Sequence, residues 1–160
     1  MITLSKNKQV LPGLVKLYAI PVFNVQNIIG NRVYVINPDY IYQFLVANDS
    51  LKATTKPVKS DRGKHYNISI QASMPGRSDY NDSVLDYIRN HKVALVYQES
   101  DGSFKRAGTK HTGFDFTYTY DTGGNDNFFQ GYRLQFNAEL KDRPLRSRNH
   151  LMHDEEEITL

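Results

Sequence analysis

The stretch FDFTYTYD, Phe114–Asp121, alternates aromatic and polar side chains at every position. A second stretch, YRLQFNAEL at 132–140, alternates apolar and polar residues in the same way. Successive side chains of a β-strand point to opposite faces, so each stretch presents one apolar and one polar face. We expect the two strands to pair antiparallel, with the aromatic rings facing a core and the polar groups facing solvent or a neighbouring subunit.

The residues between these strands begin with Asp-Thr-Gly-Gly-Asn-Asp, 121–126, which has two interpretations. Gly and Asn tolerate positive φ, so the string is typical of the turn that ends a strand. Asp-Thr-Gly is also the tripeptide at the catalytic carboxylate of retroviral-type aspartic proteases, which need only one copy per subunit. That family places Ala or Ser after the glycine, whereas Gly124 stands here. The turn is the favoured interpretation, and catalysis by Asp121 is kept as the alternative.

Hydrophobic patterning predicts further strands along the chain. They cover Val15–Ile20, Arg32–Ile36, His65–Met74, Val93–Tyr97 and Phe104–Gly108. Residues 37–50 fit either a capped helix or a strand, and the alternation of Tyr40, Tyr42, Phe44 and Val46 favours the strand. The polar, turn-rich residues 47–63 indicate an exposed loop or a long hairpin arm.

One helix is predicted over Asp79–His91. Ser78 or Asp79 can cap it, and acidic residues fill its first turns. Together these elements predict a single α+β domain over residues 1–144, a mostly antiparallel β-sandwich or partly closed barrel with one short helix. A chain of 160 residues is long enough for one substantial core.

Residues 145–160 differ in composition from the rest. The basic segment KDRPLRSRNH, 141–150, is followed by the acidic run DEEE, 154–157. A segment this polar buries too little apolar surface to fold alone, so we expect a disordered end or an arm that docks on another subunit. Basic and acidic segments would then form complementary surfaces on adjacent copies.

The composition argues against several functional classes. The chain has no Cys, which excludes disulfides and thiolate chemistry. No apolar run approaches the ~20 residues of a membrane helix, and no signal-peptide pattern is present, so we expect a soluble protein. Nucleotide-binding and nucleophile-elbow motifs are missing. His150 and His153 beside Asp154 and Glu155 are zinc-ligand types on a polar tail, and we expect no metal and no cofactor.

A net charge of +3 is too small to argue nucleic-acid binding by itself. Two basic clusters occur, one of Lys141, Arg143, Arg146 and Arg148, the other of Lys52, Lys56, Lys59, Arg62 and Lys64. Such clusters are usually solvated surface. We therefore expect passive contact with DNA at most.

The order of features from Ile68 to Pro144 resembles a known group of proteins. SIQASMPG, VLDYIRNHKVALVYQ, ESDGSFKRAGT and GYRLQFNAELKDRP follow one another, with a TG-containing loop before the last. This order is similar to that of small virion structural proteins of tailed phages infecting Bacteroidota, crAss-like phages included. The resemblance implies a non-enzymatic protein of the head, head–tail connector or tail. It also implies a ring-forming homo-oligomer contacting neighbouring virion proteins, found in the virion and, during assembly, in the host cytoplasm.

Two alternatives stay open, the protease and a soluble β-sandwich binding module. Under the favoured hypothesis, charged and turn residues on loops and termini would contact neighbouring subunits. The candidates are Lys56, Lys59, Arg62, Asp121, Asn125, Asp126, Arg143, Arg146, Arg148, Asp154, Glu155, Glu156 and Glu157.

Overall fold

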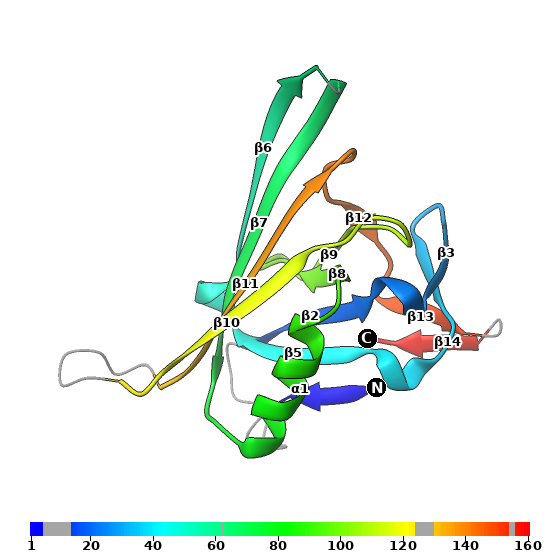
Figure 1. Ribbon diagram of the computed structural model, residues 1–160. Helices are drawn as coiled ribbons and strands as arrows, with labels where there is room; N and C mark the ends of the chain where they lie inside the picture. The colour runs from blue at the N-terminus through cyan, green and yellow to red at the C-terminus, as the bar shows by residue number, and fades with distance from the viewer. Residues whose placement is uncertain (5–13, 62, 124–129, 154–155) are drawn as a thin grey trace.

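The computed structural model describes residues 1–4, 14–61, 63–123, 130–153 and 156–160. These residues form three β-sheets and one α-helix (Figure 1). The six-stranded sheet has the order β1 (Ile2–Leu4), β5 (Tyr42–Ala47), β2 (Leu14–Pro21), β8 (Val93–Gln98), β9 (Phe104–Ala107), β12 (Leu145–Ser147). The hairpin sheet has the order β10 (Asp115–Asp121), β11 (Gly131–Leu140), β7 (Gly63–Pro75), β6 (Lys52–Ser60). The C-terminal sheet has the order β14 (Glu156–Thr159), β13 (His150–His153), β4 (Arg32–Val35), β3 (Val25–Ile29).

The six-stranded sheet is buried on both faces. Alternate residues of β2 and β8 enter two separate cores, so that Leu17 and Leu95 face the hairpin sheet while Tyr18 and Val96 face the C-terminal sheet. This double burial explains why Val93–Tyr97 reads as a continuous apolar run instead of alternating. The β-rich α+β class and the sandwich-like packing predicted from the sequence are confirmed, and the sheets do not close into a barrel.

The first core lies between the six-stranded sheet and the hairpin sheet. Phe44, Phe116 and Phe136 meet at its centre, with the Phe116 and Phe136 rings stacked at a centroid distance of 4.7 Å. The predicted antiparallel pairing of FDFTYTY with 132–140 is confirmed, because Phe116 lies opposite Phe136 in the register of β10 and β11. The rings of both strands therefore point into one core.

The helix α1 (Asp79–Arg89) closes the edge of the first core. Leu85 and Ile88 are its buried apolar residues, and the Ser78 hydroxyl accepts a hydrogen bond from the backbone N–H of Asn81 at 3.0 Å. The helix ends two residues before the predicted His91, at an Asn90 cap. With eleven residues, α1 is too short to span a membrane, and the described residues contain no other α-helix. Three 3-10 turns complete the described elements: Val22–Asn24, Pro38–Tyr40 and Asn48–Ser50.

Two ambiguous segments are resolved as strands. The strand favoured near residues 40–46 is present as β5, although it starts at Tyr42 because Pro38–Tyr40 form a 3-10 turn capped by Asn37. Most of the polar segment 47–63 forms β6, which pairs with β7 in a long hairpin arm that projects beyond the body (Figure 1). A hairpin arm was one of its two predicted forms. Every β6 side chain is exposed except that of Val58, which is half-buried.

Pro57 stands within the arm where it breaks no hydrogen bond of the sheet. Ser60 and Gly63 are the last pair of this ladder before the hairpin loop. In a tight hairpin the pair that closes the loop exchanges backbone hydrogen bonds, and so does every second pair after it. The pair of Pro57 with Tyr66 is three positions farther along the ladder, so it is a pair that exchanges no hydrogen bonds. The backbone N and C=O of Pro57 therefore point away from β7. The missing N–H of Pro57 therefore faces the open edge of β6.

The prediction of a separate tail over 145–160 is corrected where the structure describes it. β12 pairs with β9, and β13 inserts between β4 and β14 in the C-terminal sheet. Leu151 is fully buried and Leu160 is 7% exposed, both in the second core with Val33. The composition of this segment predicted a disordered end. Its few apolar residues are nevertheless buried, because they pack against strands that are distant in the sequence. Truncation at 144 would therefore remove core residues.

Substituting Phe136 by Ala should destabilise the fold by about 3–5 kcal/mol, because the ring is fully buried between two others. Phe23→Ala is the matched control, since Phe23 is 51% exposed and should cost less than about 1 kcal/mol. Urea unfolding followed by circular dichroism measures both. Equal losses for the two variants would contradict this account of the core.

Candidate interaction surfaces

The described candidate residues fall into three separate places. Lys56 and Lys59 lie on the hairpin arm, and Asp121 ends β10. The C-terminal region carries the rest, namely Arg143, Arg146, Arg148, Glu156 and Glu157. Arg62, Asn125, Asp126, Asp154 and Glu155 lie outside the described residues. The structure therefore does not gather the predicted residues into one interface.

Asp121 has the geometry of a turn residue. One carboxylate oxygen accepts the backbone N–H of Gly123 at 3.0 Å, and the other contacts the Arg133 guanidinium at 3.1 Å. Gly123 has a φ of 73°, the left-handed conformation that glycine adopts without strain. The hydrogen bond from the Gly123 N–H and then the hydrogen bond from the Arg133 guanidinium lower the pKa of Asp121. This environment favours the ionised carboxylate.

The hairpin arm is positively charged. Lys59 lies directly opposite Lys64 in the pairing of β6 with β7. Lys56 lies opposite Asn67, on the other face of the same two strands. Like charges directly opposite each other on a ladder repel, and no ion pair with another described residue compensates them. The arm thus presents exposed cations and the open edge of β6. Its β6 side chains contribute little to the core of the protein.

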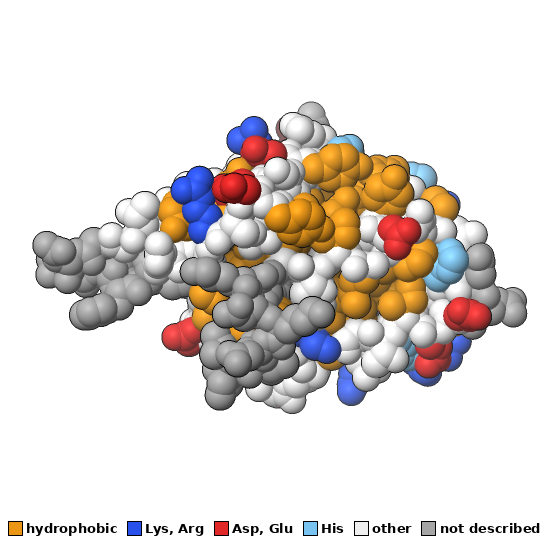
Figure 2. All heavy atoms as spheres, turned by 90° about the horizontal axis from the view of Figure 1, so that it is seen from below, with side chains coloured by type: hydrophobic (Ala, Val, Ile, Leu, Met, Phe, Trp, Pro, Cys, Tyr) orange, Lys and Arg blue, Asp and Glu red, His pale blue; other side chains and the backbone are white. Residues whose placement is uncertain are grey.

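An aromatic patch covers part of the opposite side of the molecule. Phe23, Tyr40 and Tyr87 are each at least 40% exposed, and with Tyr42 and His91 they form a chain of ring contacts. The ring centroids of Phe23 lie 5.6 Å from those of Tyr40 and His91, and Tyr87 lies 4.6 Å from His91. Figure 2 shows hydrophobic side chains gathered over this underside. We call the exposed residues Phe23, Tyr40 and Tyr87, together with His91, the aromatic patch; the Tyr42 ring lies buried beneath it.

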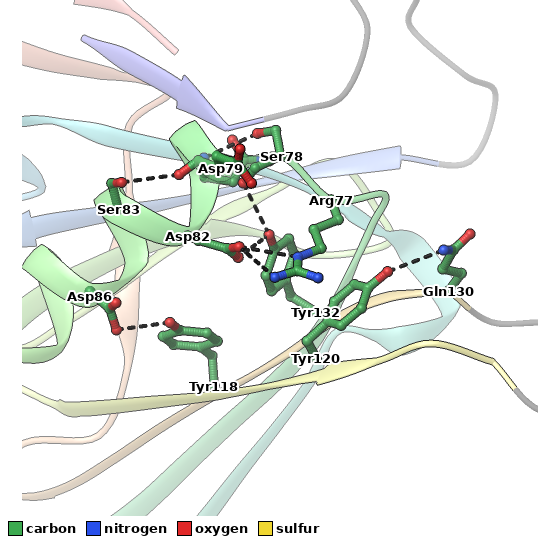
Figure 3. A network of polar contacts seen from close by, with 11 residues as sticks. Arg77, Ser78, Asp79, Asp82, Ser83, Asp86, Tyr118, Tyr120, Gln130 and Tyr132 are labelled. Carbon is green, nitrogen blue, oxygen red and sulfur yellow. Dashed lines mark hydrogen bonds and ion pairs between the residues drawn. The ribbon is translucent and has the colours of Figure 1, made fainter.

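A polar network ties α1 to the hairpin sheet (Figure 3). The Tyr132 hydroxyl donates a hydrogen bond to Asp82, whose other oxygen accepts from the Arg77 guanidinium at 3.1 Å. The Arg77 guanidinium also lies 4.8 Å from the centroid of the Tyr120 ring, and the Tyr118 hydroxyl donates to Asp86 at 2.8 Å. Burial and then the hydrogen bond to Asp82 raise the pKa of Tyr132. The polar groups of this network hydrogen-bond to one another, and these bonds fix the position of α1 against the hairpin sheet.

A cleft lies where the end of the six-stranded sheet meets the C-terminal sheet. Its volume is about 680 Å³, and it is lined by Lys16, Arg146 and Arg148 together with amide and hydroxyl side chains. The sequence indicated the two arginines as surface residues but not Lys16, which is 130 positions away from Arg146 on β2. No signal within either segment predicts that they share a cleft, because β8 and β9 lie between β2 and β12 in the sheet.

Comparison with known proteins identified no matching family model, no similar curated protein and no similar solved structure. The described residues contain no group of three or more His, Cys, Asp or Glu side chains that would hold a metal ion.

Tyr132→Phe should destabilise the protein by about 1–3 kcal/mol, because it leaves the partly buried Asp82 carboxylate without its hydroxyl donor. Tyr118→Phe is the matched control, since it removes a similar hydrogen bond to Asp86 at the exposed surface and should cost less. Thermal and urea unfolding give the difference. A larger loss for Tyr118→Phe would contradict the anchoring role of Asp82.

Proposed function

We propose that this chain is a non-enzymatic structural protein of a tailed-phage particle, which assembles with copies of itself into a ring at the connector or tail. The observation that carries the proposal is the hairpin arm of β6 and β7, which projects from the body with nearly all β6 side chains exposed. The resemblance of residues 68–144 to small virion proteins of Bacteroidota phages supports the same role.

The arm is built to reach another molecule. β11 accompanies β7 only as far as the pair of Leu140 with Tyr66, so beyond it only β6 and β7 pair with each other, from Val58 with His65 to Ser60 with Gly63. Two-stranded ribbons are marginally stable in water, because ordering their backbone costs conformational entropy that little burial offsets. A neighbouring subunit that packs against the arm would provide the missing contacts.

The aromatic patch supplies a second, different surface. Exposed apolar patches of this kind mark interaction sites. The arm projects above the body in Figure 1, and Figure 2 shows hydrophobic side chains gathered on the face seen from below. A ring requires a head-to-tail interface between two unlike surfaces of each subunit, so an arm and a patch on opposite sides meet this requirement.

Mass spectrometry of purified phage particles from cultures that carry this gene tests the virion assignment. We expect peptides of this chain in the particle fraction at a stoichiometry of several copies per particle. Detection in the cell lysate with complete absence from intact particles would overturn the assignment.

A shortened arm tests the assembly role. Removing Lys59, Ser60, Gly63 and Lys64 deletes two ladder pairs and lets the same loop close on Val58 and His65, so the pairing register is kept. Native mass spectrometry should show an oligomer for the wild type and monomers for this variant. The Lys59→Gln/Lys64→Gln variant keeps the arm length and should still assemble. Normal assembly of the shortened variant would contradict the role of the arm.

A further inference from the structure

We infer that the cleft between the six-stranded sheet and the C-terminal sheet binds a sugar unit that carries a carboxylate, as in an acidic polysaccharide. The volume of the cleft, about 680 Å³, is within the range of small-molecule sites in proteins. Its lining is mostly polar, which selects a polar ligand. This site is separate from the arm and from the patch, and it stands whether or not the chain forms a ring.

The floor of the cleft is a row of four side chains across the end of the six-stranded sheet. Gln98 of β8 pairs with Phe104 of β9, which in turn pairs with Ser147 of β12. Continuing the register of β2 and β8 by one pair places Lys16 opposite Gln98. Paired residues point to the same face of a sheet, and Phe104 belongs to the second core. All four side chains therefore face the C-terminal sheet.

The opposite wall of the cleft is held in place by hydrogen bonds between segments that are distant in the sequence. The backbone N–H of Arg148 donates to the Asn31 carbonyl at 3.1 Å, in the turn between β3 and β4. The Ser147 hydroxyl donates to the same carbonyl at 3.4 Å, which ties the floor to this turn. The backbone N–H of Leu160 donates to the Asn149 carbonyl at 2.9 Å. Floor and wall are thus positioned by the fold before a ligand binds, which lowers the entropic cost of binding.

Several hydrogen-bonding groups of the cleft are left for a ligand. The side chains of Lys16, Gln98 and Asn149 line it and form no hydrogen bond or ion pair with another described residue. An amide both donates and accepts, as a sugar hydroxyl does, so the two amides can bond to adjacent hydroxyls of a sugar. Beside the Gln98 amide, the 8% exposed Phe104 ring offers an apolar surface to the C–H groups of the sugar ring.

The cleft also favours a negative charge on the ligand. Lys16 and Arg148 form no ion pair with a described residue, and no acidic side chain is among the described residues that line the cleft. Arg146 adds no charge to the floor, because its pairing with Lys105 turns its side chain to the other face of the sheet. A free phosphate would engage the cations and leave the amides and the ring unused. A uronic acid engages all of these groups through its carboxylate, its hydroxyls and its C–H face.

NMR titration of the ¹⁵N-labelled protein with sodium glucuronate tests this site. We expect saturable shifts of the Lys16 and Gln98 signals, with a Kd of roughly 1 mM for so small a ligand. Glucose, which lacks the carboxylate, should bind at least about tenfold more weakly, because it loses the charged hydrogen bond to Lys16. Lys16→Gln and Gln98→Met should each weaken the binding of glucuronate, the first by about tenfold. Circular dichroism checks that both variants are folded.

The matched control removes the same charge from the other face of the same sheet. Lys105 is the neighbour of Phe104 on β9, and its side chain faces away from the cleft, so Lys105→Gln should leave the binding of glucuronate unchanged. An equal loss for Lys105→Gln would overturn the inference. So would the absence of saturable shifts at about 20 mM glucuronate, or equally tight binding of acetate or inorganic phosphate, which would make the cleft a site for simple anions.

Discussion

The rest of the structure depends on the burial of the six-stranded sheet on both faces. Each residue of β8 from Val93 to Tyr97 enters one of two cores, so neither face of the strand is available to water. The hairpin sheet and α1 must cover one face, and the C-terminal sheet must cover the other. Removing either cover would expose a continuous apolar surface, which makes the three layers interdependent.

Alternation within a segment predicted the elements whose burial is local. The pairing of FDFTYTY with residues 132–140 follows from period two, because a shift by one residue would turn every ring to the polar face. The helix was likewise predicted from local features, its cap and the acidic residues of its first turns. These features need no knowledge of where the segment lies in the fold.

The features that the sequence did not show depend on distant partners. Segment 145–160 looks too polar to fold, yet Leu151 and Leu160 complete a core with Val33 and Tyr18. Bulk charge likewise hides the cleft, because Lys16 and Arg148 are ordinary surface residues until sheet order brings them together. Asp121 is the reverse case, in which a suggestive tripeptide occupies a turn whose carboxylate is held by Gly123 and Arg133.

Pro57 has a consequence for how the exposed arm can meet other molecules. An open strand edge invites foreign strands to add to it without limit, which is the route to fibrils. The proline ring occupies the outward position of β6 where an added strand would seek a donor. Pro57 therefore interrupts the row of outward donors between Thr55 and Lys59, which disfavours the addition of a foreign strand along the whole of this edge.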